Sequence, residues 1–395
     1  MRVLLHTGKG GVGKTTMALA SAFGAATHGH RVFVLSTDAA HSIGDALGVS
    51  LGSEVSEVAP GVSVQEVSVL DELDDAWSAI QEWLSAFLRG DARSREDAGE
   101  EAPMVAEELL AFPGLEELIA LRAIRKVEAS GKYDVCVVDC APTGATLRLL
   151  RFPDVLRFFM ENVFEWKRRS MRAVRPLARR VHADRFIPSD EVFGAVERLY
   201  QDVADVHQIL LDGDRTSARL VVNPARVVVD ETRRSFAYLS LYGVATDALL
   251  VNRVLPDDAA SGYFAQWAVR EREELQEIDR SFPVPRFELA LQRSEPLGAE
   301  ALTALGRQLF GDEDPARFFS RSRPIRLRKK ANRTVLEIDL PNVSSEEVEV
   351  VEAGRDLVIR VRNAERLVSL PDSLTGRCLE GVHLREGVLE VCFAP

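Results

Sequence analysis

The stretch GKGGVGKTT, from Gly8 to Thr16, places glycines and lysines at a spacing that can hold phosphate groups. It fits the motif G-x-x-x-x-G-K-[ST], and it lies between an apolar run at 2–7 and a helical pattern at 14–29, the context the motif requires. A chance glycine-rich turn is the alternative, and this context argues against it. The sequence therefore predicts a nucleotide-binding loop. Its residues are Gly8, Lys9, Gly10, Gly11, Val12, Gly13, Lys14, Thr15 and Thr16.

Within this loop Lys14 is expected to contact the β- and γ-phosphates of ATP, and the Thr15 hydroxyl is expected to ligate Mg²⁺. Two aspartates end other apolar runs, Asp139 in VVDCAPTG and Asp38 in LSTDAAHS. Ligands of open α/β sheets bind beyond the carboxyl ends of the strands, so both carboxylates are expected near the loop. Asp139 is predicted to hold Mg²⁺ through water. Asp38 is either a helix cap or a functional group, and the neighbouring phosphate loop favours function.

Six short apolar runs alternate with helical patterns, which predicts a doubly wound, mostly parallel α/β sheet. The runs are apolar at successive positions, as expected for strands that are covered by helices on both faces. They span residues 2–7, 31–38, 133–142, 218–225, 247–256 and 283–289. Helical insertions are expected at about 69–130 and 151–212, inside the same domain, because strands resume after each.

Beyond Pro324 the pattern changes to a period of two, which predicts a small antiparallel β-sandwich of about seventy residues. Turn signals separate three alternating runs. The residues expected to face inward are Leu336, Ile338 and Leu340, then Leu357, Ile359 and Val361, and finally Leu389, Val391 and Phe393. We therefore expect two domains, 1–320 and 321–395.

Composition restricts the class of protein. The chain of 395 residues carries a net charge of −12, so no general attraction for nucleic acid or anionic membrane is expected. No stretch approaches a membrane span, and we expect a soluble cytoplasmic protein without stable membrane insertion. The four cysteines contain no C-x-x-C pair, which favours reduced thiols over a zinc site or disulfides.

Three stretches together, GKGGVGKT, STDAAHSIGDAL and DCAPTGATLRLL, resemble the ArsA-type ATPases over about residues 1–310. That family includes the arsenite-pump ATPase and the factor that delivers tail-anchored membrane proteins. The resemblance implies a homodimer in which Lys9 reaches the nucleotide of the other subunit and stabilises charge on the transferring phosphate. It also implies that Asp38 orients the attacking water and that Asp139 opens a second switch loop.

The same resemblance assigns adenine contacts. Asn252 in LLVNRVLP matches an adenine-contacting asparagine, and Pro296 and Leu297 in RSEPLG fall where the family lines the adenine pocket. Unlike the arsenite-pump ATPase, the chain has one phosphate loop and no soft-metal cysteine cluster. Unlike the tail-anchored-protein factor of fungi and animals, it has no C-x-x-C pairs, so zinc is not expected. Three further departures bear on switching and nucleotide affinity. They are Ala39, Ala145 and Ala225, where family members have Pro, His and Glu.

The C-terminal sandwich resembles a small heat-shock, or α-crystallin, domain in TVLEIDLPNVSSEEVEVVEAGRDLVIRV and REGVLEVCF. An ArsA-type ATPase with such a domain resembles the bacterial and plastid branch of the family, which lacks the zinc site.

The second helical insertion contains a dense apolar cluster that could contact a client. In the family, such insertions form an apolar groove for transmembrane helices. Ordinary packing of these helices on the sheet is the alternative, and the sequence alone favours it. The cluster consists of Phe158, Phe159, Met160, Val163, Phe164 and Trp166.

Three functions are consistent with these features. The first is an ATP-switched carrier that binds or delivers hydrophobic protein segments, using ATP and Mg²⁺. The second is an ATPase subunit that energises an anion or metalloid transporter. The third is an ATP-regulated chaperone that acts through the α-crystallin-like domain.

Overall fold

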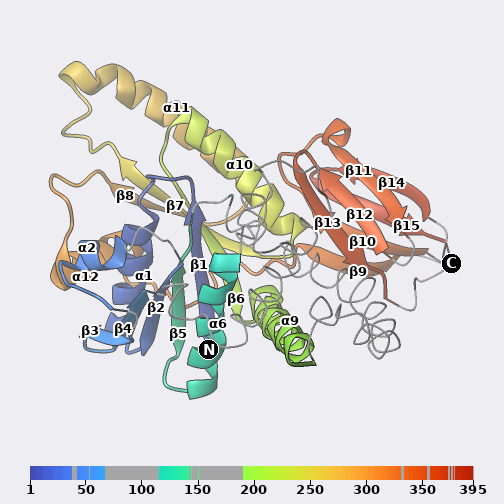
Figure 1. The fold of residues 1–395 in the computed structure, drawn as a ribbon. Helices are drawn as coiled ribbons and strands as arrows, with labels where there is room; N and C mark the ends of the chain where they lie inside the picture. Colours follow the sequence, from blue (N-terminus) through green and yellow to red (C-terminus); the bar gives the residue numbers. More distant parts are fainter. Residues whose placement is uncertain are drawn as a thin grey trace, which may run out of the picture.

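In the computed structural model a helix-covered sheet lies beside a β-sandwich, and helix α10 (Arg226–Leu241) ends at the sandwich (Figure 1). It describes residues 1–37, 42–52, 54–66, 115–141, 190–330, 333–353, 356–371 and 379–394, with Gly144, Leu150, Leu374 and Arg377. The helices, strands and contacts of the fold are those of these residues.

The N-terminal unit contains an eight-stranded sheet in the order β3-β4-β2-β5-β1-β6-β7-β8. All neighbouring strands are parallel except β3 and β4, which form an antiparallel pair at one edge. This confirms the predicted mostly parallel sheet. The strands are β1 (Arg2–Gly8), β2 (Val32–Ser36), β3 (Ser56–Ala59), β4 (Val62–Glu66), β5 (Val135–Asp139), β6 (Thr216–Val222), β7 (Thr246–Val254) and β8 (Arg286–Ala290).

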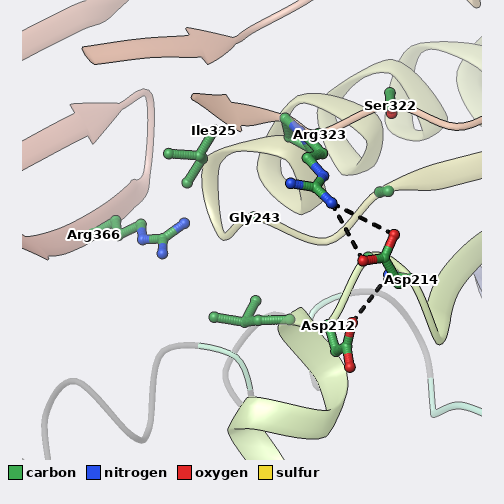
Figure 2. Close-up of a pocket in the computed structure, with 11 residues that line it drawn as sticks. Asp212, Asp214, Gly243, Ser322, Arg323, Ile325 and Arg366 are labelled. Atoms are coloured by element: carbon green, nitrogen blue, oxygen red, sulfur yellow. Dashed lines mark hydrogen bonds and ion pairs between the residues drawn. The ribbon is translucent and has the colours of Figure 1, made fainter. Parts of the chain in front are cut away.

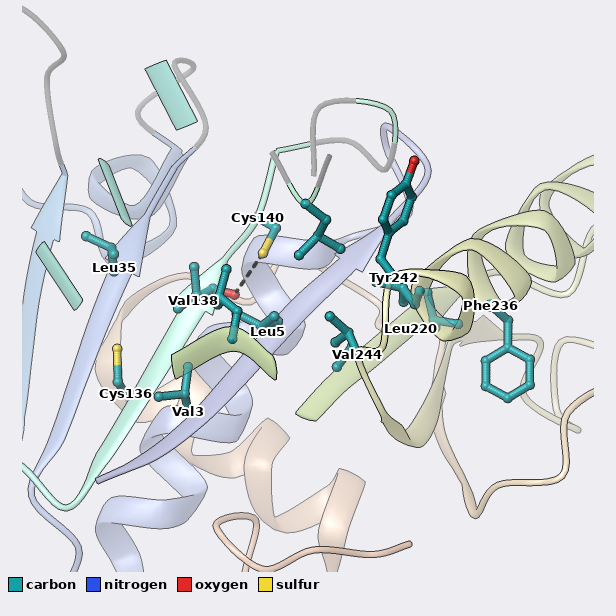
Figure 3. Packing of buried hydrophobic residues seen from close by; sticks show 14 of the residues in the cluster. Val3, Leu5, Leu35, Cys136, Val138, Cys140, Leu220, Phe236, Tyr242 and Val244 are labelled. Atoms are coloured by element: carbon teal, nitrogen blue, oxygen red, sulfur yellow. Dashed lines mark hydrogen bonds between the residues drawn. The ribbon is translucent and has the colours of Figure 1, made fainter. Parts of the chain in front are cut away.

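Helices cover both faces of this sheet, so successive residues of a strand are buried on opposite sides. In β1, Val3 and Leu5 pack in the same cluster as Phe236 of α10, whereas Leu4 packs with Met17 of α1. Figure 3 shows the first of these clusters. The helices are α1 (Lys14–Thr27), α2 (Ser42–Leu47), α6 (Leu115–Ser130), α9 (Asp190–Leu211), α10 (Arg226–Leu241), α11 (Ala265–Ser281) and α12 (Gly298–Phe310), with the 3-10 turn η4 (Gly262–Phe264) before α11.

The C-terminal unit is an antiparallel sandwich of a four-stranded sheet, β14-β15-β10-β9, and a three-stranded sheet, β11-β12-β13. The nine residues predicted to face inward are all buried. The strands are β9 (Ile325–Lys330), β10 (Arg333–Asp339), β11 (Val348–Ala353), β12 (Asp356–Val361), β13 (Ala364–Ser369), β14 (Leu379–Arg385) and β15 (Val388–Phe393), with the turn η5 (Ser345–Glu347).

The sandwich packs against the C-terminal end of α10. Leu241 is fully buried within the hydrophobic core of the sandwich, and Tyr238 packs against that core. The Tyr242 hydroxyl donates a hydrogen bond to the Glu365 carbonyl oxygen over 2.9 Å, and Arg366 donates to the carbonyl oxygen of Leu241. A cavity of about 370 Å³ lies at this junction, and Arg366 is among the residues that line it (Figure 2).

A buried arginine connects the sheet to the segment between the two units. The side chain of Arg219 on β6 is fully buried, 3.2 Å from an Asp247 oxygen, and donates to the carbonyl oxygen of Pro315 over 2.7 Å. Its guanidinium also lies 4.8 Å from the ring centre of Phe319. Arg2 forms a second ion pair with Asp247 at 3.0 Å, and burial lowers the pKa of Arg2 to about 9 although Asp247 raises it.

Candidate nucleotide site

The predicted phosphate loop lies between the end of β1 and the start of α1, as the motif requires. Gly13 precedes α1 in the left-handed region, with φ of 94°. A Cβ atom at Gly13 would lie 2.3 Å from Nδ2 of Asn252, and one at Gly8 would lie 2.3 Å from the carbonyl oxygen of Val221. Neither position has room for a side chain. The first N–H groups of α1 lack partners within the helix, and with the positive end of its dipole they suit an anion.

Asn252 supports this loop from behind. Its Nδ2 donates to the carbonyl oxygen of Val12 over 2.8 Å, and its Oδ1 accepts a hydrogen bond from the Arg253 backbone over 2.9 Å. The residue is buried at 6% exposure. Asn252 therefore holds the shape of the loop in this structure. Its expected contact with adenine stays a prediction.

Thr15 and Asp139 meet beside the loop. The Thr15 hydroxyl donates to an Asp139 carboxylate oxygen over 2.6 Å and lies 2.9 Å from the Ser42 hydroxyl oxygen. Asp139 ends β5 and is almost fully buried. Hydroxyl and carboxylate oxygens are the hard donors that Mg²⁺ prefers, so these residues fit the predicted metal. Sequence reasoning missed Ser42, although it stands in STDAAHSIGDAL, four residues after Asp38.

The two loop lysines are oriented differently. Lys14 is buried, and its Nζ donates to the carbonyl oxygen of Lys9 at 3.4 Å, within the loop. The Lys9 side chain instead forms an ion pair with Glu231 on α10, with Nζ 3.2 Å from the carboxylate oxygen. Both side chains of this pair are about one-third exposed, at 35% and 33%. No signal in the sequence identified Glu231.

Other predicted residues are placed as follows. Pro296 and Leu297 come directly before α12, and Leu297 is 53% exposed. Ala225 precedes α10 and lines a cavity of about 530 Å³ together with Arg253 and Trp267. The remaining predicted residues lie outside the described part of the chain. These are Asp38, Ala39, Ala145 and the apolar cluster of Phe158, Phe159, Met160, Val163, Phe164 and Trp166.

Burial keeps two titratable side chains of the parallel sheet neutral. His6 on β1 lies 2.9 Å from the Ser21 hydroxyl, and burial together with the Arg219 charge lowers its pKa well below 6.5. Burial also raises the pKa of the Cys136 thiol to about 12. Cys136 and Cys140 are buried in the N-terminal unit and Cys392 lies in the sandwich, and none of these three described cysteines forms a disulfide.

The described residues contain no group of three or more His, Cys, Asp or Glu side chains arranged to hold a metal ion. Among the same residues, every helix is too short or too polar to cross a bilayer.

The parallel sheet, the glycine-dependent loop and the Thr15–Asp139 pair define a P-loop nucleotide-binding protein. The chain belongs to the ArsA-type ATPase family, since residues 1–311 match the family model described as "Anion-transporting ATPase". Residues 331–393 match a second model, described as "HSP20-like domain found in ArsA". The chain is therefore an ATPase with an HSP20-like domain, which confirms the resemblance seen in the sequence.

Relatives resemble the chain over nearly its whole length. The protein named "Putative arsenical pump-driving ATPase" of Prosthecochloris vibrioformis is 33% identical over 382 residues, covering 95% of this chain and 92% of the relative. "Putative arsenical pump-driving ATPase 1" of Aquifex aeolicus is 31% identical, covering 95% of each chain. "ATPase GET3" of Malassezia globosa is 30% identical over 249 residues, covering 63% of this chain and 71% of the relative.

Proposed function

We propose that the chain is a dimeric, Mg²⁺-dependent ATPase switch that binds hydrophobic protein segments. The orientation of the Lys9 side chain is the main observation that supports the proposed dimer. Its ammonium group is held by Glu231 on α10 rather than beside the Lys14 side chain. A partly exposed lysine that points away from its own loop can reach a facing copy more easily than the phosphates of that loop.

The proposed roles follow from the positions of the side chains. The loop and Lys14 hold the phosphates of ATP. Thr15 and Asp139 hold Mg²⁺, which supplies charge neutralisation on the phosphates when it is bound. Lys9 stabilises charge on the phosphate that is transferred in the other subunit. Asp38 orients the attacking water, a role that rests on the family resemblance.

A hydrophobic client is favoured over a metalloid by the positions of the thiols. Cys136 and Cys140 belong to the buried core of the sheet, whereas Cys392 lies on β15 of the sandwich. Cys392 lies in a different unit from Cys136 and Cys140, so the three described thiols do not form one soft-metal site. The second candidate, an ATPase that drives a transporter, is supported by the names of the bacterial relatives.

Nucleotide-dependent capture of a peptide tests the proposal. The purified chain would be mixed with a labelled apolar helix of about 20 residues, long enough to span a membrane. We expect capture to be several-fold stronger with a non-hydrolysable ATP analogue than with ADP. A peptide of equal length with two central lysines is the control. Equal capture of both peptides, or none with either nucleotide, would contradict the carrier function.

A further inference from the structure

An exposed group of aromatic side chains lies at the N-terminal end of α11, outside the phosphate site. Every residue from Ser261 to Trp267 is exposed. Tyr263, Phe264 and Trp267 are 86%, 46% and 61% exposed, and we call these three residues the aromatic patch. The rings of Tyr263 and Phe264 pack edge to face, with centres 5.2 Å apart. In Figure 1, α11 projects past the end of the sheet.

The area of the aromatic patch is large for a surface left in water. Aromatic side chains present roughly 150–250 Å² each, so the patch exposes on the order of 400 Å². The largest apolar patch on a soluble monomer has about this area and is often functional. A stable interface needs about 800 Å² on each partner, so the patch would supply roughly half of one.

The aromatic patch and the Lys9–Glu231 ion pair are both linked to helix α10. Phe264 and Trp267 line the 530 Å³ cavity together with Ala225 and Arg226, where α10 begins. Glu231, the partner of Lys9, follows on the same helix. Helix α10 thus links the aromatic patch to the ion pair of Lys9, so we expect a second copy that receives Lys9 to lie near the patch as well.

The charges around this cavity favour a second copy over an apolar client. Its lining includes Arg226, Arg253 and Arg270 together with Glu273 and Glu274. Within the described chain, none of these five side chains forms an ion pair. In a two-fold arrangement, arginines of one copy can meet glutamates of the other, which makes the surface self-complementary. A transmembrane segment carries no charges to pair with these groups, so their burial against it would be costly.

We propose that the aromatic patch and the charged rim of this cavity form the surface on which a second copy of the chain docks when the ATP-bound dimer closes. This inference rests on the proposed function, because it assumes that Lys9 acts across a dimer. It identifies a structural element that joins the two copies without a zinc site.

Sedimentation velocity of the full-length chain with a non-hydrolysable ATP analogue tests the docking surface. The double substitution Tyr263→Ser with Trp267→Ser is expected to raise the dimer dissociation constant at least about ten-fold, since aromatic residues dominate most interfaces. Trp267→Phe should retain dimerisation. Leu327→Ser, which changes a residue that is 48% exposed on the sandwich, is the matched control and should leave the constant unchanged.

Nucleotide binding and melting temperature separate the possible outcomes. The double variant should bind the analogue with the same affinity as the wild-type monomer. It should also have the same melting temperature as the wild type. An unchanged dimer constant in the double variant would overturn the docking surface alone. A wild-type chain that stays monomeric with the analogue would overturn both this surface and the dimeric switch. Loss of peptide capture with normal dimerisation would assign the patch to a client and contradict a second copy.

Discussion

The Thr15–Asp139 hydrogen bond gives the most direct prediction at the scale of single residues. If Asp139 holds Mg²⁺ through water and orients Thr15, Asp139→Asn should weaken Mg²⁺ affinity about 10–100-fold, as losses of outer-shell partners usually do. The Mg²⁺ dependence of ATP hydrolysis measures this effect. Asp134→Asn, which removes the exposed ion pair with Arg31 at the other end of β5, is the control and should leave the Mg²⁺ dependence unchanged. Equal Mg²⁺ dependence in both variants would refute the assignment.

Glu231 offers a second test at this scale, because its ion pair keeps Lys9 on its own subunit. Such ion pairs contribute about 0.2–1 kcal/mol each, and two of them break when a dimer forms. Glu231→Gln should therefore lower the protein concentration for half-maximal ATPase activity by roughly 2–30-fold. Asp230→Asn, which loses only the neighbouring pair with Arg233, is the matched control. A higher concentration requirement in Glu231→Gln would mean that Glu231 supports the dimer instead of competing with it.

The position of the phosphate loop between a strand and a helix was predictable, because the motif fixes its residue types locally. Gly13 is needed for its backbone angle and for its contact with Asn252, and the motif already requires glycine there. Partners that are distant in sequence carried no such signal. Glu231 lies on the surface of α10, where a glutamate usually contacts only water. Arg219 lies on β6, and a charged arginine is not expected to be buried in a strand. Only the fold brings Lys9 and Asp247 to these residues.

At the scale of elements, the strands were predictable because both helix layers impose a simple pattern on them. The β3–β4 hairpin was missed, since it is short and lies at the sheet edge, where β4 alternates between buried and half-buried residues. The contact between α10 and the sandwich was also missed. A tertiary contact leaves no periodic pattern, and Leu241 alone does not reveal which core it enters.

Helix α10 makes a specific prediction about truncation. The proposed boundary near Arg321 leaves Phe318 and Phe319 with the ATPase, where their rings contact Arg2 and Arg219. A chain ending at Phe319 should therefore fold and bind ATP. It should also melt at a lower temperature than the full chain, because Leu241 loses the core around it and becomes exposed to water.

Adding Leu241→Ser to the truncated chain separates the two effects. The substitution should restore solubility there, because it removes an exposed leucine. In the full chain the same change should cost about 2–5 kcal/mol of unfolding free energy, the range for truncating a large core side chain. A truncated chain that cannot bind ATP would show that the ATPase unit depends on the sandwich for its fold.

At the scale of the whole molecule, the two kinds of unit and their order along the chain were predictable from the pattern of apolar residues. Runs apolar on both faces indicated the covered sheet, and alternation indicated the sandwich, because these two patterns have different physical causes. The pattern could not show how the units dock. It also could not reveal the aromatic patch. Large aromatic residues such as Tyr263 and Trp267 are usually expected in a core, and only the structure shows that they are exposed.

Mixing two inactive variants tests the central claim, that the ATPase site is completed by the Lys9 of a second copy. Lys9→Ala and Asp38→Asn should each bind ATP and hydrolyse it very slowly. In a mixed dimer, one site keeps its own Asp38 and receives Lys9 from the partner. An equal mixture should recover about a quarter of wild-type activity, because half of randomly paired dimers are mixed and each has one complete site. Energy transfer between labelled chains would verify that mixed dimers form. No recovery in their presence would contradict action of Lys9 across the dimer.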